Sequence, residues 1–230
     1  MSNNQPWDLL RGEIVVCEAC PRLVQWREQV AREKVRRHRD EAYWGKPLPG
    51  FGDSRARLLV LGLAPAAHGG NRTGRMFTGD DSGHWLYEAL HRYGFANQPT
   101  STHASDGLTL HGAFISNSCR CVPPDNKPTP EEVRNCRPYL LQELALLGEL
   151  RVILCLGKIA FDAYLQCRRE QGRNVSGYRF AHGAEQPPAA PGEPWVLASY
   201  HPSRQNTNTG RLTRSKWHGI FARCRQLVDT

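Results

Sequence analysis

The residues of this chain whose types and spacing could do chemistry are, first, four cysteines. Cys17 and Cys20 are separated by two residues, and Cys121 and Cys136 by fourteen. If the fold brings these thiolates together, they suit a [4Fe–4S] cluster or a structural zinc ion, and the spacing does not choose between the two. Cys119 lies two residues before Cys121 and could replace it as a ligand.

The other cysteines indicate no metal site. Cys155, Cys167 and Cys224 lie in apolar or helical patterns and are typical of small core residues. Eight cysteines in 230 residues fall well below the density of a small disulfide-bonded secreted protein. The first residues also lack the basic start and apolar centre of a secretory signal. We therefore expect a cytoplasmic, nucleoid-associated protein with reduced thiols.

Composition narrows the class of protein further. Hydrophobic residues make up 40% of the chain, which argues against intrinsic disorder. The longest nearly continuous apolar run, residues 58–67, is far shorter than the roughly 20 residues that cross a bilayer. The formal net charge of +8 raises the expectation of a polyanionic partner such as nucleic acid.

The elements that must position these residues alternate along the chain. Apolar runs rich in β-formers predict buried strands, and helical patterns follow each of them. The predicted strands are residues 56–63, 113–116, 151–156 and 195–199, and the predicted helices are residues 82–93, 130–147, 158–169 and 215–227. This order predicts a three-layer α/β/α fold with a central, mostly parallel four-stranded sheet.

The domain organisation follows from the same pattern. We expect one domain over residues 1–230, in which an N-terminal helical segment, residues 1–50, precedes an α/β/α body, residues 51–230. The clearest helix start is Thr129-Pro130-Glu131-Glu132, which has a capping hydroxyl, a proline at the first helical position and a glutamate at the third. This start places Cys136 on an early turn of its helix.

Two loops after predicted strands are rich in functional residue types. Ligands of an open parallel sheet bind beyond the carboxyl ends of its strands. The first loop runs from Gly62 to Gly83 and is rich in glycine. It lacks the glycine spacing of the loops that bind the phosphates of nucleotides. The second, Ser199 to Thr207, contains His201, which we expect to face the crevice.

These residues resemble the uracil-DNA glycosylase superfamily, and specifically its family 5, the type B iron–sulfur enzymes. Residues 62–74 are similar to the first active-site motif of that family, and His201-Pro202-Ser203 to the second. Related families carry an acidic or amide side chain in the first motif, where this chain has Leu63 and Ala66, and that replacement is itself a mark of family 5. The resemblance covers nearly the whole chain.

The resemblance implies a monofunctional glycosylase that flips uracil out of DNA, hydrolyses its N-glycosidic bond and leaves an abasic site. It implies that His201 donates to uracil O2 and that Asp80, with Asp81 as its rival, serves the sugar and the attacking water. Phe77 would stack on the base, and either Asn117 or Asn126 would read its edge. The remaining residues expected to bind substrate are Gly62, Ala64, Pro65, Ala66 and His68.

The resemblance also favours a [4Fe–4S] cluster held by Cys17, Cys20, Cys121 and Cys136, which would staple the N-terminal segment to the body. The residues expected to contact DNA phosphates are Arg72, Arg75, Ser203, Arg204 and Arg211, with Arg214 close by. A second basic patch, residues 32–39, ranks below these loops because such a run is usually an exposed helix face.

We expect the partner to be DNA that contains uracil or other deaminated bases. We expect no association with a membrane, and we expect the protein to be a monomer. Two alternatives stay open from the residues. One is a non-catalytic, metal-stapled DNA-binding protein, and the other is a zinc-stapled hydrolase that acts on a small substrate.

Overall fold

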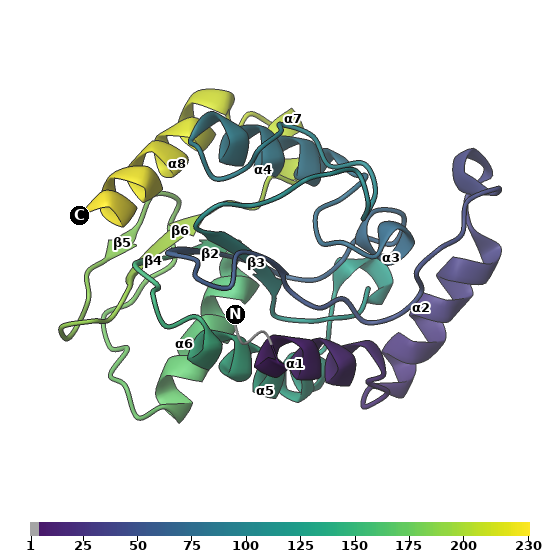
Figure 1. Cartoon of the computed structure of the whole chain (residues 1–230), viewed down its shortest axis with the longest axis horizontal. Helices are drawn as coiled ribbons and strands as arrows, with labels where there is room; N and C mark the ends of the chain where they lie inside the picture. Colours follow the sequence, from purple (N-terminus) through teal and green to yellow (C-terminus); the bar gives the residue numbers. More distant parts are fainter. Residues whose placement is uncertain (1–4) are drawn as a thin grey trace.

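A six-stranded sheet runs through the middle of the protein, and helices cover both of its faces (Figure 1). The structure is a computed structural model that describes residues 5–230. The strands are β1 (Phe51–Gly52), β2 (Leu58–Gly62), β3 (Ala113–Asn117), β4 (Val152–Leu156), β5 (Glu185–Gln186) and β6 (Trp195–Ser199), and their order across the sheet is β1-β3-β2-β4-β6-β5.

The four strands β2, β3, β4 and β6 are parallel neighbours and confirm the four strands predicted from the sequence. The prediction of a four-stranded sheet is nevertheless wrong, because β1 and β5 add an antiparallel strand at each edge. Each of these edge strands has two residues, which is too short to show the alternation that identifies a strand in a sequence.

The helices lie in two layers and at one end of the sheet. Their bounds are α1 (Gln5–Val15), α2 (Pro21–Glu33), α3 (Gly70–Thr73), α4 (Asp81–Arg92), α5 (Pro130–Leu146), α6 (Lys158–Glu170), α7 (Arg204–Asn208) and α8 (Arg214–Asp229), with 3-10 turns η1 (Arg36–His38) and η2 (Pro124–Asn126). Helices α4 and α8 cover one face, and α1, α5 and α6 lie on the other (Figure 1). No helix within residues 5–230 is long and apolar enough to cross a membrane.

Alternation along each central strand builds the two cores. In β2, Leu58 and Val60 point into the core beneath α4 and α8, whereas Leu59 and Leu61 point into the core beneath α5 and α6. Since both faces are covered, all five residues of β2 are buried and the strand is an unbroken apolar run.

The predicted start of α5 is confirmed as a capping box. The Thr129 hydroxyl accepts a hydrogen bond from the Glu132 backbone N–H (3.2 Å), and the Glu132 carboxylate accepts one from the Thr129 backbone N–H (2.7 Å). Glu132 also accepts two hydrogen bonds from the guanidinium of Arg22 on α2. Glu132 therefore also joins the N-terminal segment to the body.

A buried ion pair joins the sheet to α5. Arg120 lies three residues beyond the end of β3. It donates two hydrogen bonds to the Glu143 carboxylate (2.9 and 2.7 Å), and each of the two side chains is 1% exposed. Glu143 also accepts hydrogen bonds from the Ser116 hydroxyl (2.5 Å) and from the Gly50 backbone N–H (3.2 Å). These added donors compensate the desolvation of the carboxylate.

We predict that Glu143→Gln lowers the free energy of unfolding by about 3–5 kcal/mol, because it leaves the Arg120 charge buried without its partner. Asp162→Asn, which breaks the exposed pair between Lys158 and Asp162, is the control and should cost less than about 1 kcal/mol. Urea unfolding of both variants measures the two losses. Equal losses would show that the buried pair does not stabilise the fold.

Candidate functional site

The candidate site forms where three parallel strands end. Gly62 ends β2 and is paired in register with Asn117, which ends β3. A Cβ atom added to Gly62 would lie 2.3 Å from Asn117 Oδ1 and 2.7 Å from Cζ of Phe77. Glycine therefore lets the amide and the aromatic ring approach the end of β2, and these predicted residues are brought together.

Phe77 has a strained backbone and a fixed ring. Its φ is +53°, which is rare for an aromatic residue, and its side chain is 7% exposed. The ring stacks on the imidazole of His201, with centroids 5.8 Å apart and planes at 26°. The first turn of α4 packs so closely that a Cβ at Gly83 would lie 1.8 Å from the Phe77 carbonyl oxygen. Strain of this kind is typical of functional sites.

Asn117 offers an unpaired acceptor. Its side-chain oxygen is buried and has no hydrogen-bond partner within residues 5–230. A buried polar atom without a partner is costly, and this acceptor is available to a ligand. The other predicted amide, Asn126, lies elsewhere: it is exposed in η2, with a left-handed backbone (φ +56°).

His201 follows the end of β6 and stands over Phe77. Burial lowers its pKa to about 4, so the imidazole is neutral at pH 7 and carries one N–H donor. The Asn206 side chain donates a hydrogen bond to the His201 carbonyl oxygen (2.9 Å) and fixes the loop. The site thus holds a neutral hydrogen-bond donor beside the stacking ring.

His182 supports this loop, and the sequence analysis missed it. Its Nδ1 accepts a hydrogen bond from the Tyr200 backbone N–H (3.3 Å) and lies 3.3 Å from the Ser199 hydroxyl oxygen. Its ring stacks on that of Tyr200 at 5.1 Å. A single histidine in a loop rich in glycine and proline has no spacing that would reveal this role, because its partners lie seventeen and eighteen residues away.

Asp80 caps α4, and its second oxygen is left for the site. Oδ1 accepts a hydrogen bond from the Gly83 backbone N–H (2.8 Å). A Cβ at Gly69 would lie 2.3 Å from Oδ2, so this oxygen lies against the first-motif loop. Burial raises the pKa of the carboxyl group. Its rival Asp81 instead pairs with Arg204 at a half-exposed position.

One contact joins the two motif loops directly. The Ser82 hydroxyl, in the first turn of α4, donates a hydrogen bond to the Pro202 carbonyl oxygen (3.2 Å). Together with the Phe77–His201 stack, it brings the first and second motifs to one place.

The rest of the first motif forms the wall beside the site. Ala66 accepts a backbone hydrogen bond from Asn71 (3.0 Å), and a Cβ at Gly70 would lie 3.1 Å from Pro65. His68 Nδ1 lies 3.1 Å from the Tyr43 hydroxyl, and burial lowers the pKa of His68. Ala64 packs against the cysteines, so the wall of the site touches the predicted cluster region.

The predicted DNA-contacting arginines separate into two groups. Arg75 is 4% exposed, pairs with Asp106 (2.6 Å) and donates to Thr78 and Ser101. This internal position corrects the expectation that it meets a phosphate. Arg72 is also mostly covered, since it pairs with Glu41 and donates to the His68 carbonyl oxygen (2.8 Å).

The second group lies on the surface around the second motif. Ser203 precedes α7 as its N-cap residue, and Arg204 is exposed beside Asp81. The guanidinium of Arg211 lies 4.2 Å over the Tyr200 ring, and that of Arg214 lies 3.9 Å over the Trp85 ring. Stacking on an aromatic face orients both cations, and Arg214 also donates a hydrogen bond to the Glu88 carboxylate (3.2 Å).

Three of the four predicted metal ligands gather with Cys119 beside α2 and α5. Cys119, Cys121 and Cys136 form a buried group with Leu23, and Cys20 packs against it. Hydrogen-bond donors point at three of the sulfurs. Arg27 lies 3.2 Å from Cys121 Sγ, the Arg120 backbone N–H 3.4 Å from Cys136 Sγ, and the Asn135 amide 3.5 Å from Cys20 Sγ.

The thiols also affect one another electrostatically. Burial raises the pKa of Cys121 to about 12, although Arg27 opposes the shift. Burial raises the pKa of Cys20 as well, and its neighbours Cys136 and Cys17 add to the increase. Within residues 5–230, no three Cys, His, Asp or Glu side chains converge closely enough to hold a single metal ion.

The chain is similar in sequence to known proteins of one family. The family model described as the uracil DNA glycosylase superfamily matches residues 49–223. A type-5 uracil-DNA glycosylase of Thermus thermophilus is 50% identical over 94% of this chain and 95% of its own. A type-5 uracil-DNA glycosylase of Mycobacterium bovis is 48% identical over 95% of this chain and 81% of its own. One of Pyrobaculum aerophilum is 44% identical over 90% of this chain and 87% of its own.

The lowered pKa of His201 predicts a pH-dependent stability. The unfolded chain takes up this proton near pH 6.5 and the folded protein only near pH 4, so acid favours unfolding. Between these pH values, the free energy of unfolding should fall by up to about 3 kcal/mol more in the wild type than in His201→Asn. Chemical unfolding at a series of pH values measures the difference, and parallel curves would contradict a neutral, buried His201.

Proposed function

This chain belongs to the uracil-DNA glycosylase superfamily and is a uracil-excising DNA repair glycosylase, and from that premise we propose how its residues divide the work. The reaction hydrolyses the N-glycosidic bond between uracil and deoxyribose. The bond from C1′ to the base breaks, the oxygen of one water joins C1′, and the departing base receives the proton. An abasic site remains in the DNA.

The observation that carries the proposal is the unpaired side-chain oxygen of Asn117. Uracil presents an N3–H donor beside its O4 acceptor, so one carboxamide can accept from N3–H and donate to O4. Cytosine presents an acceptor at N3 and an amine donor at C4, which is the reverse pattern. Asn117 with its oxygen toward N3 and its NH2 group toward O4 therefore favours uracil, because cytosine leaves the amide facing like groups.

Stacking supplies the rest of the recognition. Extruding a base costs a few kcal/mol, and a flipped base recovers part of this by stacking on an aromatic side chain. Phe77 is suited to that role because its backbone is fixed between Gly62 and α4. Because Gly62 has no side chain, the Asn117 amide and the Phe77 ring can both lie against the end of β2.

The chemical step needs partners for two developing charges. Negative charge grows on the departing uracil, and the neutral imidazole of His201 is suited to donate a hydrogen bond to its O2. Positive charge grows on the sugar, and the ionised carboxylate of Asp80 can stabilise it and orient the attacking water. The raised pKa of Asp80 follows from burial, which also strengthens its effect on the sugar.

We further propose that Cys17, Cys20, Cys121 and Cys136 hold a [4Fe–4S] cluster. Their donor set is suitable, since iron–sulfur clusters take thiolates and are stabilised by hydrogen bonds to the sulfurs such as those from Arg27 and Asn135. When bound, the cluster would hold the N-terminal segment by covalent ligation. The glycosidic step uses none of its electrons.

Phosphate contacts come from the exposed group around the second motif. Ser203 and Arg204 follow His201 closely in the chain, Arg211 lies ten residues after it, and both arginines are exposed. Contacts there would position the flipped nucleotide and carry no sequence information.

We predict that Asp80→Asn slows excision of uracil from duplex DNA by about 10²-fold or more, because the amide cannot balance the positive sugar. Asp81→Asn is the matched control and should excise at nearly the wild-type rate. Single-turnover assays with a labelled uracil-containing oligonucleotide measure both rates. The wild-type rate should fall as the pH drops through the raised pKa of Asp80, since protonation removes the charge. Full activity in Asp80→Asn would restrict Asp80 to capping α4.

A second prediction concerns the cysteines. Cys121→Ala should yield protein with little iron and no broad visible absorption, because a cluster needs all four thiolates. Cys119→Ala should keep both the iron and the colour. Iron, zinc and acid-labile sulfide analyses of the purified variants decide between the metals. Colour retained in Cys121→Ala and lost in Cys119→Ala would reverse the assignment of the third ligand.

A further inference from the structure

A basic segment between α2 and the first motif is left unused by the proposed site. Arg36, Arg37 and Arg39, in and beside η1, are exposed. None of the three forms an ion pair with a carboxylate within residues 5–230, whereas Arg72, only a short distance away, is paired with Glu41. Their positive charges are therefore not neutralised by ion pairs within the described residues.

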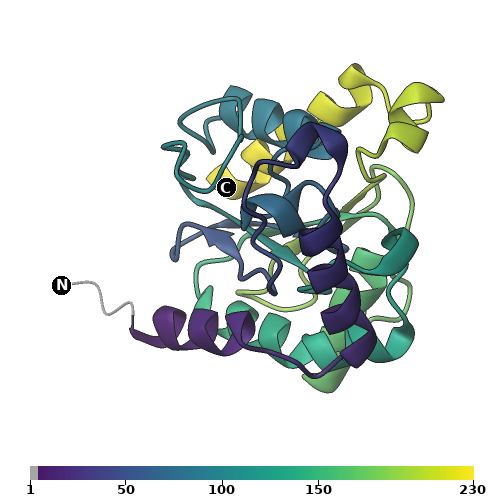
Figure 2. The ribbon, with the colours of Figure 1, turned by 90° about the vertical axis from the view of Figure 1, so that its right-hand side faces the viewer.

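The same segment is pinned to the first-motif loop. The backbone N–H groups of Trp44 and Gly45 donate to the carbonyl oxygens of Arg72 (2.9 Å) and Asn71 (3.0 Å). The Tyr43 hydroxyl lies 3.1 Å from His68 Nδ1. Figure 2 faces this end of the molecule, with α2 in the foreground and the chain that follows it passing beside α3. The arginines thus lie at the same end of the molecule as the candidate site.

Nearby carboxylates do not cancel this charge. Glu41 lies 2.6 Å from His38 and also pairs with Arg72, and Glu33 accepts a hydrogen bond from Gln29 (2.8 Å). Asp40 is exposed and is the one further acid in this stretch. Three exposed arginines against two exposed carboxylates, Glu33 and Asp40, leave a local positive excess. Arg37 is also close enough to lower the pKa of His68, after the larger effect of burial.

We propose that Arg36, Arg37 and Arg39 form a second phosphate-binding surface that contacts the duplex backbone beside the flipped nucleotide. This inference rests on the proposed function, since it assigns a partner to the same enzyme. The contacts of the segment with Asn71 and Arg72 give it a fixed place relative to the loop that carries Phe77.

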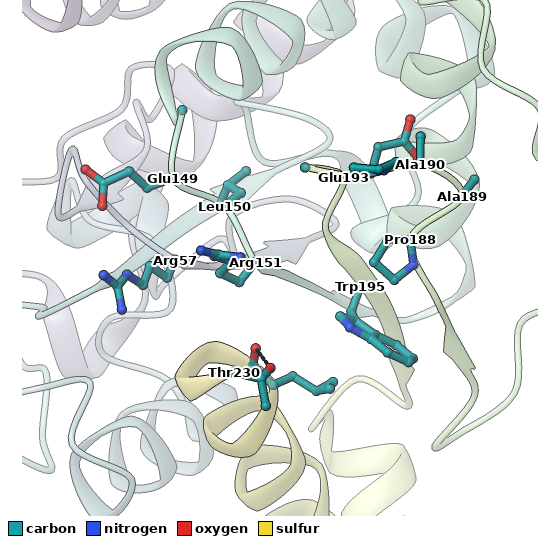
Figure 3. A pocket seen from close by; sticks show the side chains of 14 residues that line it. Arg57, Glu149, Leu150, Arg151, Pro188, Ala189, Ala190, Glu193, Trp195 and Thr230 are labelled. Atoms are coloured by element: carbon teal, nitrogen blue, oxygen red, sulfur yellow. Dashed lines mark hydrogen bonds between the residues drawn. The ribbon is translucent and has the colours of Figure 1, made fainter.

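The opposite end of the parallel strands, where they begin, carries three arginines that serve as a matched control. A pocket of about 750 Å³ opens there, where β4 and β6 begin, and its lining includes Arg57, Arg151 and the acidic residues Glu149 and Glu193 (Figure 3). Arg57 and Arg151 immediately precede β2 and β4, so the length of a strand separates them from the candidate site. With the neighbouring Arg55, they are exposed and form no ion pair within the described residues.

The test compares two triple variants that remove the same charge. One is Arg36→Ala/Arg37→Ala/Arg39→Ala, and the control is Arg55→Ala/Arg57→Ala/Arg151→Ala. Binding to a uracil-containing duplex and to the same duplex without uracil is measured over a series of salt concentrations. Each lost phosphate contact should reduce the slope of log K against log salt by about 0.9. We expect a reduction of about 0.9 to 2.7 in the first variant, equal on both duplexes, and little change in the control.

Two results would overturn the inference. One is an unchanged slope in the first variant, and the other is an equal reduction in both variants, which would reflect net charge alone. Thermal unfolding of both variants checks that they are folded, and single substitutions at Arg36, Arg37 and Arg39 replace the triple variant if it is not. Excision of uracil by the wild type is assayed in parallel, so that failure of the proposed function is seen separately from failure of the binding surface.

Discussion

The buried ion pair between Arg120 and Glu143 is the constraint on which the arrangement of the site depends. Arg120 stands between Cys119 and Cys121, and three residues after Asn117, so its position fixes both the cysteines and the end of β3. Glu143 reaches it from α5 and also binds Ser116 and Gly50. A charge buried in this way tolerates little displacement, because a lost hydrogen bond cannot be replaced by water. One pair therefore holds the sheet, α5 and the region before β1 in register.

The cysteine group and the candidate site are neighbours for the same reason. Ala64 packs on the cysteines from the first-motif loop, and the side-chain amide of Asn71 donates to the Arg27 carbonyl oxygen (3.1 Å) on α2. Arg27 in turn donates to the Cys17 carbonyl oxygen (3.0 Å) and to Cys121 Sγ. A proposed cluster at this place would stabilise the wall of the site through α2, although it lies outside the reaction. This contiguity gives a physical reason for the proposed cluster in an enzyme whose chemistry requires none.

Burial sets the protonation states in the site, and it acts in opposite directions on the two proposed catalytic groups. It raises the pKa of Asp80 and lowers that of His201, because in each case desolvation disfavours the charged form. His201 is thereby kept neutral, and a neutral imidazole can still donate its one N–H to the departing anion. The Gly83 backbone N–H donates to Asp80 Oδ1 and orients the carboxyl group. The two groups are suited to their proposed roles by the closed surroundings that the two motif loops create.

The sequence by itself determined the four central strands, the long helices that follow them, the capped start of α5 and the two loops at the carboxyl ends of the strands. These features depend on local pattern, which is visible along the chain. Only the tertiary structure decided the two edge strands, the internal position of Arg75 and the role of His182. Arg75 and His182 have partners 26 to 31 and 17 to 18 residues away, respectively, so no local pattern distinguishes them from surface residues. The tertiary structure also separated Asn117, buried at the end of a strand, from Asn126, exposed in a turn, because burial depends on what packs around a residue rather than on the residues beside it.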